Sequence, residues 1–418
     1  MIGLIIIMFF CFLIKLTGVS KSFTIFFFYT LFDNGLKFIG PINVKDIVLI
    51  VFLIILFNKR MVKKYKYPFY YCSLLSVVSY CISAYMASEP HWPFMILKCM
   101  RYFMLPVCFY YFIIKVNNGV IYFSKHLLWF STFIVLYSIL ELTIGTSPIV
   151  NFINDYNGDG YNMDEAFRYG VKRIQTVFIH STALGYYCVT ASAFLLLCVD
   201  NNIRRLNKIS DLNYWLVIFG LAIITFLTGT RSAMIPLVFI YLWYTRNKIL
   251  NIKYLIWYII LLFALFITAQ IYLSDYFDTV LDSILNTNDN AVGSSTDMRQ
   301  VQFAIALYYF LQAPVFGNGT SFTFDVVTPI NPDMYGAESV WMPLMIDNGI
   351  VGCIAYLLCY VYCFIYILQN KNKIDCIFTL GLILFINTAT SVPGFDVGYI
   401  FILTLCFAEI QYYKIQSD

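Results

Sequence analysis

The chain has 418 residues, of which 61% are hydrophobic and only 12% are charged. Its mean hydropathy of +0.76 lies far outside the range of soluble domains, so we expect an integral membrane protein without a nucleic-acid partner. The apolar runs are about 16 to 25 residues long and have helical rather than alternating character, which excludes an outer-membrane β-barrel. No small-residue cleavage site follows the first run, which predicts a retained span rather than a removed signal.

Basic residues in the loops predict the orientation, because lysine and arginine collect on the cytoplasmic side. The stretch 58–66 carries five basic residues and no acidic one, so we place it in the cytoplasm. When the predicted spans are counted onward from 58–66, the stretches 201–208 and 370–373 and the C-terminus also fall on the cytoplasmic side. We expect about 12 spans, with one or two in the first 40 residues, two in 213–245, and the others near 42–58, 68–87, 94–114, 121–144, 177–199, 253–273, 340–368, 375–391 and 397–413.

Residues 213–245 could form one long helix or two short ones. A single helix would be about 50 Å long, whereas the hydrocarbon core is about 30 Å thick. It would also put the basic stretches 201–208 and 245–253 on opposite sides of the membrane. Two spans broken at Thr228–Gly229–Thr230 avoid both problems. This break places Arg231 near the outer face.

Two outer loops are long, at 145–176 and 274–339. In the second, "SSTDMRQVQFAIALYYFLQ" predicts a helix with a Ser or Thr cap that lies along the membrane surface. A Pro/Gly turn, "APVFGNG", follows it. The same loop carries a single basic residue, Arg299, and eight acidic ones, namely Asp275, Asp278, Asp282, Asp289, Asp297, Asp325, Asp333 and Glu338.

The cysteines and the short motifs indicate neither a disulfide framework nor a metal site. All twelve cysteines fall in or at the edge of apolar runs, so we expect no structural disulfide. The sequence contains no Walker loop, zinc-binding spacing or nucleophile elbow, and we expect no metal and no cofactor. The whole chain, 1–418, is predicted to form a single all-α, polytopic membrane domain.

Three arginines are expected on the outer side: Arg173, Arg231 and Arg299. An arginine at mid-bilayer costs roughly 2.5 to 3.5 kcal/mol, and the charge bias of loops disfavours basic residues on this side, so each needs a partner. A guanidinium keeps its charge at any working pH, and its fork of donors matches phosphate oxygens. Several arginines at the outer mouth of a helix bundle would suit a lipid-linked diphosphate.

Each of these cations also has a plainer explanation. Arg173 could be an interfacial residue that reaches out to water. Arg231 could cap the preceding helix or pair with Glu141, and Arg299 could form a surface ion pair. Arg101, one to two turns inside its predicted span, could also pair with Glu141. These alternatives stay open at the level of the sequence.

Glu338 begins the apolar stretch "ESVWMPLMIDNGIVG". A carboxylate where water meets the bundle can act as a general base towards a sugar hydroxyl, particularly if partial burial raises its pKa. It could equally be a solvated acid that the helix dipole stabilises. Asp347 lies deeper in the same helix, where we expect hydrogen bonds to neighbouring helices, and His180 is expected to be structural. Both are kept as secondary candidates.

Four segments, in order, resemble the O-antigen polymerase and ligase family of bacterial envelope polysaccharide synthesis, the Wzy and WaaL proteins. "KRIQTVFIHSTALGYY" looks like the family's arginine-containing entry to a middle span, with Ser181 in place of a proline. "LTGTRSAMIPL" is similar to its Ser/Thr-x-Ser/Thr-Arg-Ser/Gly turn. "DMRQVQFAIALYYFLQAPVFGNG" resembles its block of arginine, amphipathic helix and Pro-x-x-Gly-x-Gly, and "ESVWMPLMIDNGIVG" resembles the acidic, x-Gly-Ile-x-Gly span that follows.

The resemblance implies an all-helical fold like that of the glycosyltransferase C class. It implies a metal-independent enzyme of the bacterial inner membrane that acts on glycans linked to undecaprenyl or a similar polyprenyl diphosphate. By matching position, Arg173, Arg231 and Arg299 would bind the diphosphate, and Arg231 and Arg299 would stabilise it as it leaves. Glu338 stands where ligases commonly carry a histidine base, which favours a polymerase.

The leading hypothesis is an inverting polymerase, with its active site facing outward, that joins a lipid-linked glycan donor to a lipid-linked acceptor. Membrane lipid surrounds both substrates, and the family suggests a chain-length regulator as a protein partner. A ligase that moves finished glycan to a lipid or protein acceptor is the alternative among enzymes. A transporter or flippase of lipid-linked sugars is the alternative from another class, for which charges reaching both faces would be expected.

Overall fold

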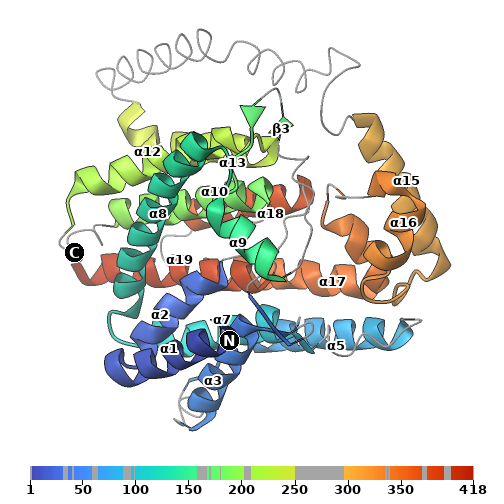
Figure 1. Cartoon of the computed structure of the whole chain (residues 1–418), viewed down its shortest axis with the longest axis horizontal. Coiled ribbons are helices and arrows are strands. Elements are labelled where there is room, and N and C mark those ends of the chain that lie inside the picture. The colour runs from blue at the N-terminus through green and yellow to red at the C-terminus, as the bar shows by residue number, and fades with distance from the viewer. Residues whose placement is uncertain are drawn as a thin grey trace.

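The long apolar runs form helices, because in lipid the backbone N–H and C=O groups must be paired within the segment itself. Figure 1 shows the resulting helical bundle, a computed structural model. The structure describes residues 2–31, 36–39, 42–58, 65–87, 96–97, 99–157, 167–168, 171–178, 180–201, 209–249, 296–334, 337, 339–369, 374–389 and 397–417.

The elements follow the predicted spans closely. The first half of the chain contains α1 (Ile2–Thr17), α2 (Val19–Thr30), β1 (Lys37–Ile39), β2 (Ile42–Asn43), α3 (Val44–Asn58), α5 (Tyr70–Met86), η1 (Met100–Met104), α7 (Leu105–Phe109), η2 (Tyr110–Ile114), α8 (Gly119–Ile144), α9 (Pro148–Asn157), β3 (Phe167–Arg168), β4 (Val171–Lys172) and α10 (Ser181–Asp200). The second half contains α12 (Asp211–Leu227), α13 (Arg231–Ile249), α15 (Thr296–Gln312), η4 (Thr323–Val327), α16 (Thr328–Ile330), η5 (Pro332–Met334), α17 (Trp341–Leu368), α18 (Ile374–Ala389) and α19 (Val397–Ser417).

The predicted all-α class is confirmed. Among the described residues, α8, α10 and α17 are long and apolar enough to cross a membrane, and six shorter apolar helices accompany them. The predicted span at 253–273 lies outside the described residues. The total number of spans and the likeness to the glycosyltransferase C class stay predictions.

The predicted break in 213–245 is present. Helix α12 ends at Leu227 and α13 begins at Arg231, and Gly229 between them has a φ of 63°. This left-handed conformation costs a glycine little, whereas a residue with a side chain rarely adopts it. The glycine therefore lets the chain reverse direction between two short helices.

Helix α10 lies at the centre of the bundle, and nearly all of its residues are buried. It packs against α12, α13, α8 and α19, while α17 packs against α5, α15, α18 and α19. In Figure 1 the C-terminus lies at one end of the long axis of the molecule, and α15 and α16 lie at the other. The twelve cysteines are free thiols.

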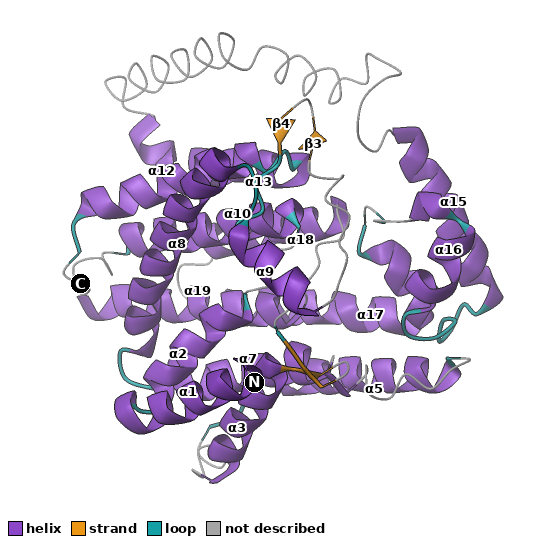
Figure 2. Cartoon of the chain, in the orientation of Figure 1, coloured by secondary structure: helices purple, strands orange, loops and turns teal. Residues whose placement is uncertain are grey.

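Two small hairpins were not predicted. Strand β1 pairs antiparallel with β2, and β3 pairs antiparallel with β4 (Figure 2). The second hairpin and helix α9 fall in the predicted outer loop 145–176, which thus contains regular secondary structure. Strands of two or three residues leave too little alternation in the sequence to be recognised.

Helix α17 is kinked at Gly349, where φ is 61° and ψ is −160°. The kink frees backbone groups that the Pro/Gly turn then pairs. The N–H groups of Ile350 and Val351 donate to the carbonyls of Pro314 and Val315, at 2.9 and 3.2 Å. Such pairing is required wherever a helix is broken within an apolar environment. We call this contact between 313–319 and the kink the kink lock.

Two glycines of the turn allow this close approach. A Cβ atom on Gly317 would lie 2.3 Å from the carbonyl oxygen of Asp347, and one on Gly319 would lie 2.5 Å from Cα of Ala87. The N–H of Gly319 donates to the carbonyl of Asp347 at 3.1 Å. The Pro-x-x-Gly-x-Gly block therefore seats the chain that follows α15 on α17 and against the end of α5.

Candidate functional site

Arg173 lies at the break between α12 and α13 and is half-buried. Its Nε donates to the carbonyl oxygen of Thr228 at 2.7 Å, and its Nη2 donates to Oγ1 of Thr230 at 3.1 Å. The N–H of Ile174 donates to the carbonyl of Leu227 at 3.4 Å. The last carbonyls of a helix have no partner within that helix, so Arg173 caps α12. Capping of this helix was weighed for Arg231 in the sequence, and here Arg173 performs it.

Arg231 is the first residue of α13 and directly follows Thr230, which receives the hydrogen bond from Arg173. The carbonyl of Thr230 accepts from the N–H groups of Ala233 and Met234, which begins the helix. A helix N-terminus carries about half a positive elementary charge. Arg173, the first residue of α13 and the positive helix end therefore lie at one turn, an arrangement suited to an anion such as a phosphate.

Glu141 fixes the chain that leads from Arg173. The residue is only 4% exposed. Its two carboxylate oxygens accept from the backbone N–H groups of Gln175 and Thr176, at 3.2 and 2.7 Å. Burial of an unpaired carboxylate would cost several kcal/mol, and these two donors offset part of that cost.

Helices α13 and α18 pack antiparallel. Near the end of α13, the Trp243 indole N–H donates to Oδ1 of Asp375 at 2.7 Å, and the Tyr244 hydroxyl lies 3.3 Å from Oγ1 of Thr379. Both partners belong to the start of α18. The start of α13, with Arg231, therefore lies towards the end of α18.

The end of α18 in turn contacts the start of α17. The N–H of Val340 donates to the carbonyl of Asn387 at 3.2 Å, and the indole N–H of Trp341 donates to Oγ1 of Thr388 at 3.2 Å. The starts of α13 and α17 thus lie at the same end of the bundle. We call it the arginine end.

Arg299 belongs to a different element. It is the fourth residue of α15, and it is exposed. Helix α15 packs against α17 through a small core that includes Ala306, Met342 and Ile346. The predicted helix is confirmed, while its position along a membrane surface stays a prediction. The structure thus brings Arg173 and Arg231 to one turn and holds Arg299 on a helix that packs against the first half of α17.

Glu338 lies outside the described residues, between Ala337, which is buried, and Ser339. Asp347 is 6% exposed, and its carboxylate accepts from the N–H and the hydroxyl of Thr323 at 2.8 and 2.6 Å. This agrees with the expected role in binding a neighbouring segment. His180 precedes α10, and its carbonyl accepts two of the first N–H groups of that helix.

The partner of Arg101 is Asp46, which was not predicted from the sequence. It is 1% exposed and accepts from Nε and Nη2 of Arg101, at 2.8 and 2.9 Å. This bidentate pair joins α3 to η1, and the N–H of Asn43 donates to the same carboxylate at 3.0 Å. An acidic residue at the edge of the apolar run 42–58 was the available signal, because a charge there needs a partner.

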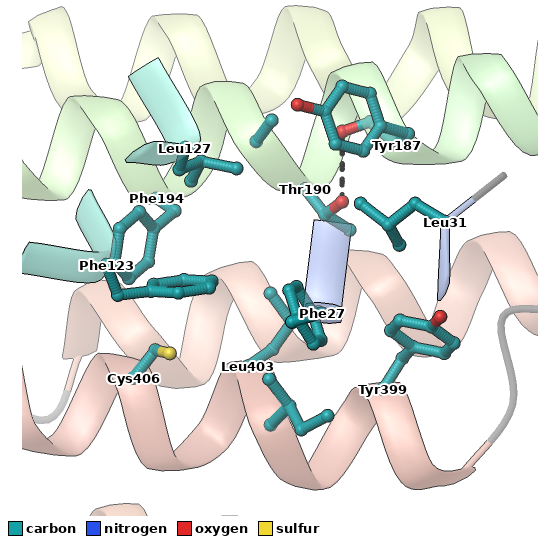
Figure 3. Close-up of a pocket in the computed structure, with 12 residues that line it drawn as sticks. Phe27, Leu31, Phe123, Leu127, Tyr187, Thr190, Phe194, Tyr399, Leu403 and Cys406 are labelled. Carbon is teal, nitrogen blue, oxygen red and sulfur yellow. Dashed lines mark hydrogen bonds between the residues drawn. The ribbon is translucent and has the colours of Figure 1, made fainter. Parts of the chain in front are cut away.

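A cavity of about 50 Å³ lies within the bundle between α2, α8, α10 and α19 (Figure 3). Its lining is largely carbon, from side chains such as Phe27, Phe123 and Phe194. The hydroxyl of Thr190 donates to the carbonyl of Tyr187 at 3.0 Å. A dry, apolar lining does not suit a phosphate or a sugar, and no candidate site residue lines it. Within the described part of the chain, no group of three or more His, Cys, Asp or Glu side chains could hold a metal ion.

Comparison with known proteins identifies the family of one segment. Residues 216–357 match the model of a family described as O-antigen ligase. The segment runs from α12 into α17 and includes Arg231, Arg299 and Glu338, whereas Arg173 precedes it. The match confirms the resemblance to the O-antigen polymerase and ligase family predicted from the motifs. No curated protein matches the chain.

Proposed function

We propose that this chain, whose residues 216–357 match the O-antigen ligase family, polymerises lipid-linked oligosaccharide repeat units into a surface polysaccharide. It would transfer a growing glycan from its polyprenyl diphosphate to a hydroxyl of the next lipid-linked unit. The reaction would take place at the outer face of a bacterial inner membrane, with the C-terminus in the cytoplasm.

The meeting of Arg173 and Arg231 at the start of α13 is the observation that supports this proposal. A diphosphate presents several anionic oxygens, and the turn offers two cations and a helix N-terminus. Arg299 would complete the site from α15. The start of α17 lies at the same end of the bundle, where it would face the polar part of a lipid-linked substrate.

The proposed reaction is an in-line displacement at the anomeric carbon of the donor sugar. A hydroxyl oxygen of the acceptor forms the new bond to this carbon, and the bond from the carbon to the diphosphate oxygen breaks with inversion. The bonding electrons leave with the polyprenyl diphosphate. Arg231 and Arg299 would balance the growing negative charge, and each such donor is worth about 2.7 to 4 kcal/mol where it has been removed by mutation.

The acceptor hydroxyl must lose a proton during this step. Glu338 would accept it as general base, since a carboxylate close to the hydroxyl can take up the proton as the new bond forms. Its chain neighbours Ala337 and Ser339 lie next to the start of α17 at the arginine end. Removal of the carboxylate should therefore slow transfer without preventing donor binding.

Reconstituted vesicles that contain a lipid-linked repeat unit test the proposal. Wild type should yield a ladder of longer glycans, and the double variant Arg231→Ala, Arg299→Ala should yield none. Arg246→Ala is the matched control, because Arg246 lies at the opposite end of α13, where it pairs with Asp375 at 3.1 Å. A full ladder from the double variant would reject the mechanism.

The description of the matched family supports one alternative, a ligase that attaches finished glycan to another acceptor. The same arginine end would then bind the same diphosphate, and only the acceptor would differ. Product analysis separates the two functions, because a ligase makes a single transfer and leaves no ladder. A lipid or protein acceptor that gains one glycan in the vesicle assay would replace the polymerase proposal.

A further inference from the structure

Residues 173–178, which we call the strap, precede α10 in the chain. The strap forms hydrogen bonds both to the end of α8 and to the turn between α12 and α13. At one end, the side chain of Arg173 and the backbone N–H of Ile174 donate to the turn. At the other, Gln175 and Thr176 donate their N–H groups to Glu141. The strap therefore links α8 to the turn that precedes Arg231.

The end of α8 is an unfavourable place for a carboxylate. Glu141 is buried in the last turn of this helix, where the helix dipole is negative. The two N–H donors of the strap offset both effects, because hydrogen bonds to a charged acceptor are stronger than those to a neutral one. The strap thus supplies two donors to the carboxylate, and the carboxylate in turn holds two backbone groups of the strap.

The strap is held in a conformation that its sequence does not favour. Thr176 has a φ of 51°, in the left-handed region that β-branched residues avoid. Its N–H donates to Glu141, and its carbonyl accepts from the hydroxyl of Ser147. Such strain persists only where the surroundings impose it. Here the two hydrogen bonds that impose it come from Glu141 at the end of α8 and from Ser147 just after that helix.

We propose that Glu141 is a positioning residue for the arginine pair, an inference that rests on the proposed function. Its role would be to place other residues rather than to bind substrate itself. It holds the strap, the strap holds Arg173 against Thr228 and Thr230, and the turn sets the start of α13 at Arg231. Without the carboxylate, the strap relaxes and Arg173 loses its fixed position at the turn that begins α13, although the helices remain folded.

Glu141→Gln is the sharpest substitution, because it keeps the size of the side chain. A carboxylate offers an acceptor oxygen to each of two N–H groups, whereas a glutamine offers one oxygen and turns an NH₂ donor towards the other. Glu141→Asp keeps the charge but shortens the side chain by one methylene. Glu141→Asp should therefore impair the positioning of the strap less than Glu141→Gln does, since an aspartate still provides two acceptor oxygens.

Vesicle assays of transfer should show that Glu141 acts through Arg173. We expect Glu141→Gln to lower kcat/KM for the lipid-linked donor about tenfold, mainly through a higher donor KM, with the acceptor KM unchanged. Arg173→Ala should lower it further. The double variant should be no worse than Arg173→Ala alone, because two residues in one chain of contacts are not additive. Multiplied effects, or a wild-type donor KM in Glu141→Gln, would overturn the proposal.

Hydrogen exchange of the purified full chain gives a readout that does not need activity. In Glu141→Gln, the amides of Gln175 and Thr176 should exchange at least about tenfold faster, because their hydrogen bonds to the carboxylate are lost or weakened. The amides of 228–230, which donate within α12 and the turn itself, should also exchange faster, because the strap no longer holds the turn in place. In Arg173→Ala, only the turn should exchange faster. Thr143→Ala is the matched control, since Thr143 lies in the same last turn of α8, is exposed, and donates within its own helix to Leu140.

The two readouts distinguish the two proposals. If wild type transfers no sugar but the exchange pattern is as expected, the proposed function fails and the positioning contact stands. If Glu141→Gln leaves exchange in the strap and the turn unchanged, the positioning role fails whatever the activity. General loosening of α8 and α10 in the same variant would also reject it, because it would make Glu141 a residue of overall stability.

Discussion

Arg173 and Arg231 stand at the same turn, yet their contacts differ. Two N–H groups of Arg173 donate to Thr228 and Thr230, so this side chain stabilises the turn and also adds a positive charge to it. Arg231 begins a helix, and its charge adds to the positive helix end. Removal of the Arg173 side chain should therefore lower both the stability of the protein and its activity. Removal of the Arg231 side chain should lower the activity more than the stability.

A comparison of Arg173→Ala with Arg231→Ala tests this division of roles. Loss of two charge-assisted hydrogen bonds from Arg173 should cost about 1.5 to 3 kcal/mol each before relaxation and lower the Tm measurably. Arg231→Ala should lower transfer by about 100-fold with a smaller change in Tm. Fluorescence-monitored melting in detergent and the ladder assay measure the two effects. An equal loss of Tm in both variants would contradict the assignment.

The pair of Asp46 and Arg101 supports a second prediction at this scale. Asp46→Asn leaves Arg101 beside an uncharged amide between α3 and η1. Because the Arg101 side chain is 35% exposed and partly screened by solvent, the expected loss is about 1 to 2 kcal/mol rather than that of a fully buried pair. Asp333→Asn, at an exposed carboxylate, is the control for melting, and a wild-type Tm for Asp46→Asn would refute the prediction.

At the scale of whole helices, the kink lock is the contact that fixes α15 relative to α17. The turn at 313–319 pairs the backbone groups that the kink at Gly349 exposes, and so fixes the end of α15 relative to α17. Because α15 carries Arg299, the lock sets this candidate site residue relative to α17. The Pro-x-x-Gly-x-Gly block, although part of the family resemblance, thus has a structural role in the contacts described.

Gly349→Ala should break the lock. The added Cβ would lie 2.6 Å from both the N of Gly317 and the carbonyl oxygen of Val315, at a φ of 61°. We expect a loss of at least about 2 kcal/mol, from the clash and the left-handed φ together, and a lower Tm. Gly381→Ala is the opposite control: Gly381 lies inside α18 with no atom within 4 Å of the added Cβ. An alanine there should stabilise the helix by about 0.5 to 1 kcal/mol.

The whole molecule has two ends, and the predicted topology assigns one to each side of the membrane. The arginine end holds the starts of α13 and α17, while the C-terminus lies at the other end of the long axis (Figure 1). Loops with many basic residues belong to the cytoplasmic side. The arginine end should therefore face outward.

Cysteine labelling in intact cells tests this orientation. A membrane-impermeant maleimide should label Thr146→Cys, after α8, and should label Ser210→Cys, before α12, only once the cells are opened. The unaltered chain, whose twelve free thiols supply the background, is the control. The reverse pattern would place the arginine end in the cytoplasm and remove the basis of the proposed function.

Much of the fold could be predicted because membrane helices are encoded locally. Length and hydropathy located α3, α5, α8, α10, α17, α18 and α19 within a few residues, and the length limit of a span predicted the break at Gly229. The kink in α17, the hairpins and helix α9 were not predicted. They depend on contacts with distant segments, or are too short to leave a periodic pattern.

The sequence by itself indicated a helical membrane protein, a turn between α12 and α13, and a resemblance to the O-antigen polymerase and ligase family, whose model matches residues 216–357. These properties follow from composition, segment length and short motifs. Only the tertiary structure decided that Arg173 caps α12, that Asp46 pairs with Arg101, and that Glu141 binds the strap. These partners lie 55, 55 and 35 positions apart, and a hydrogen bond at such separations forms only after packing has brought the helices together.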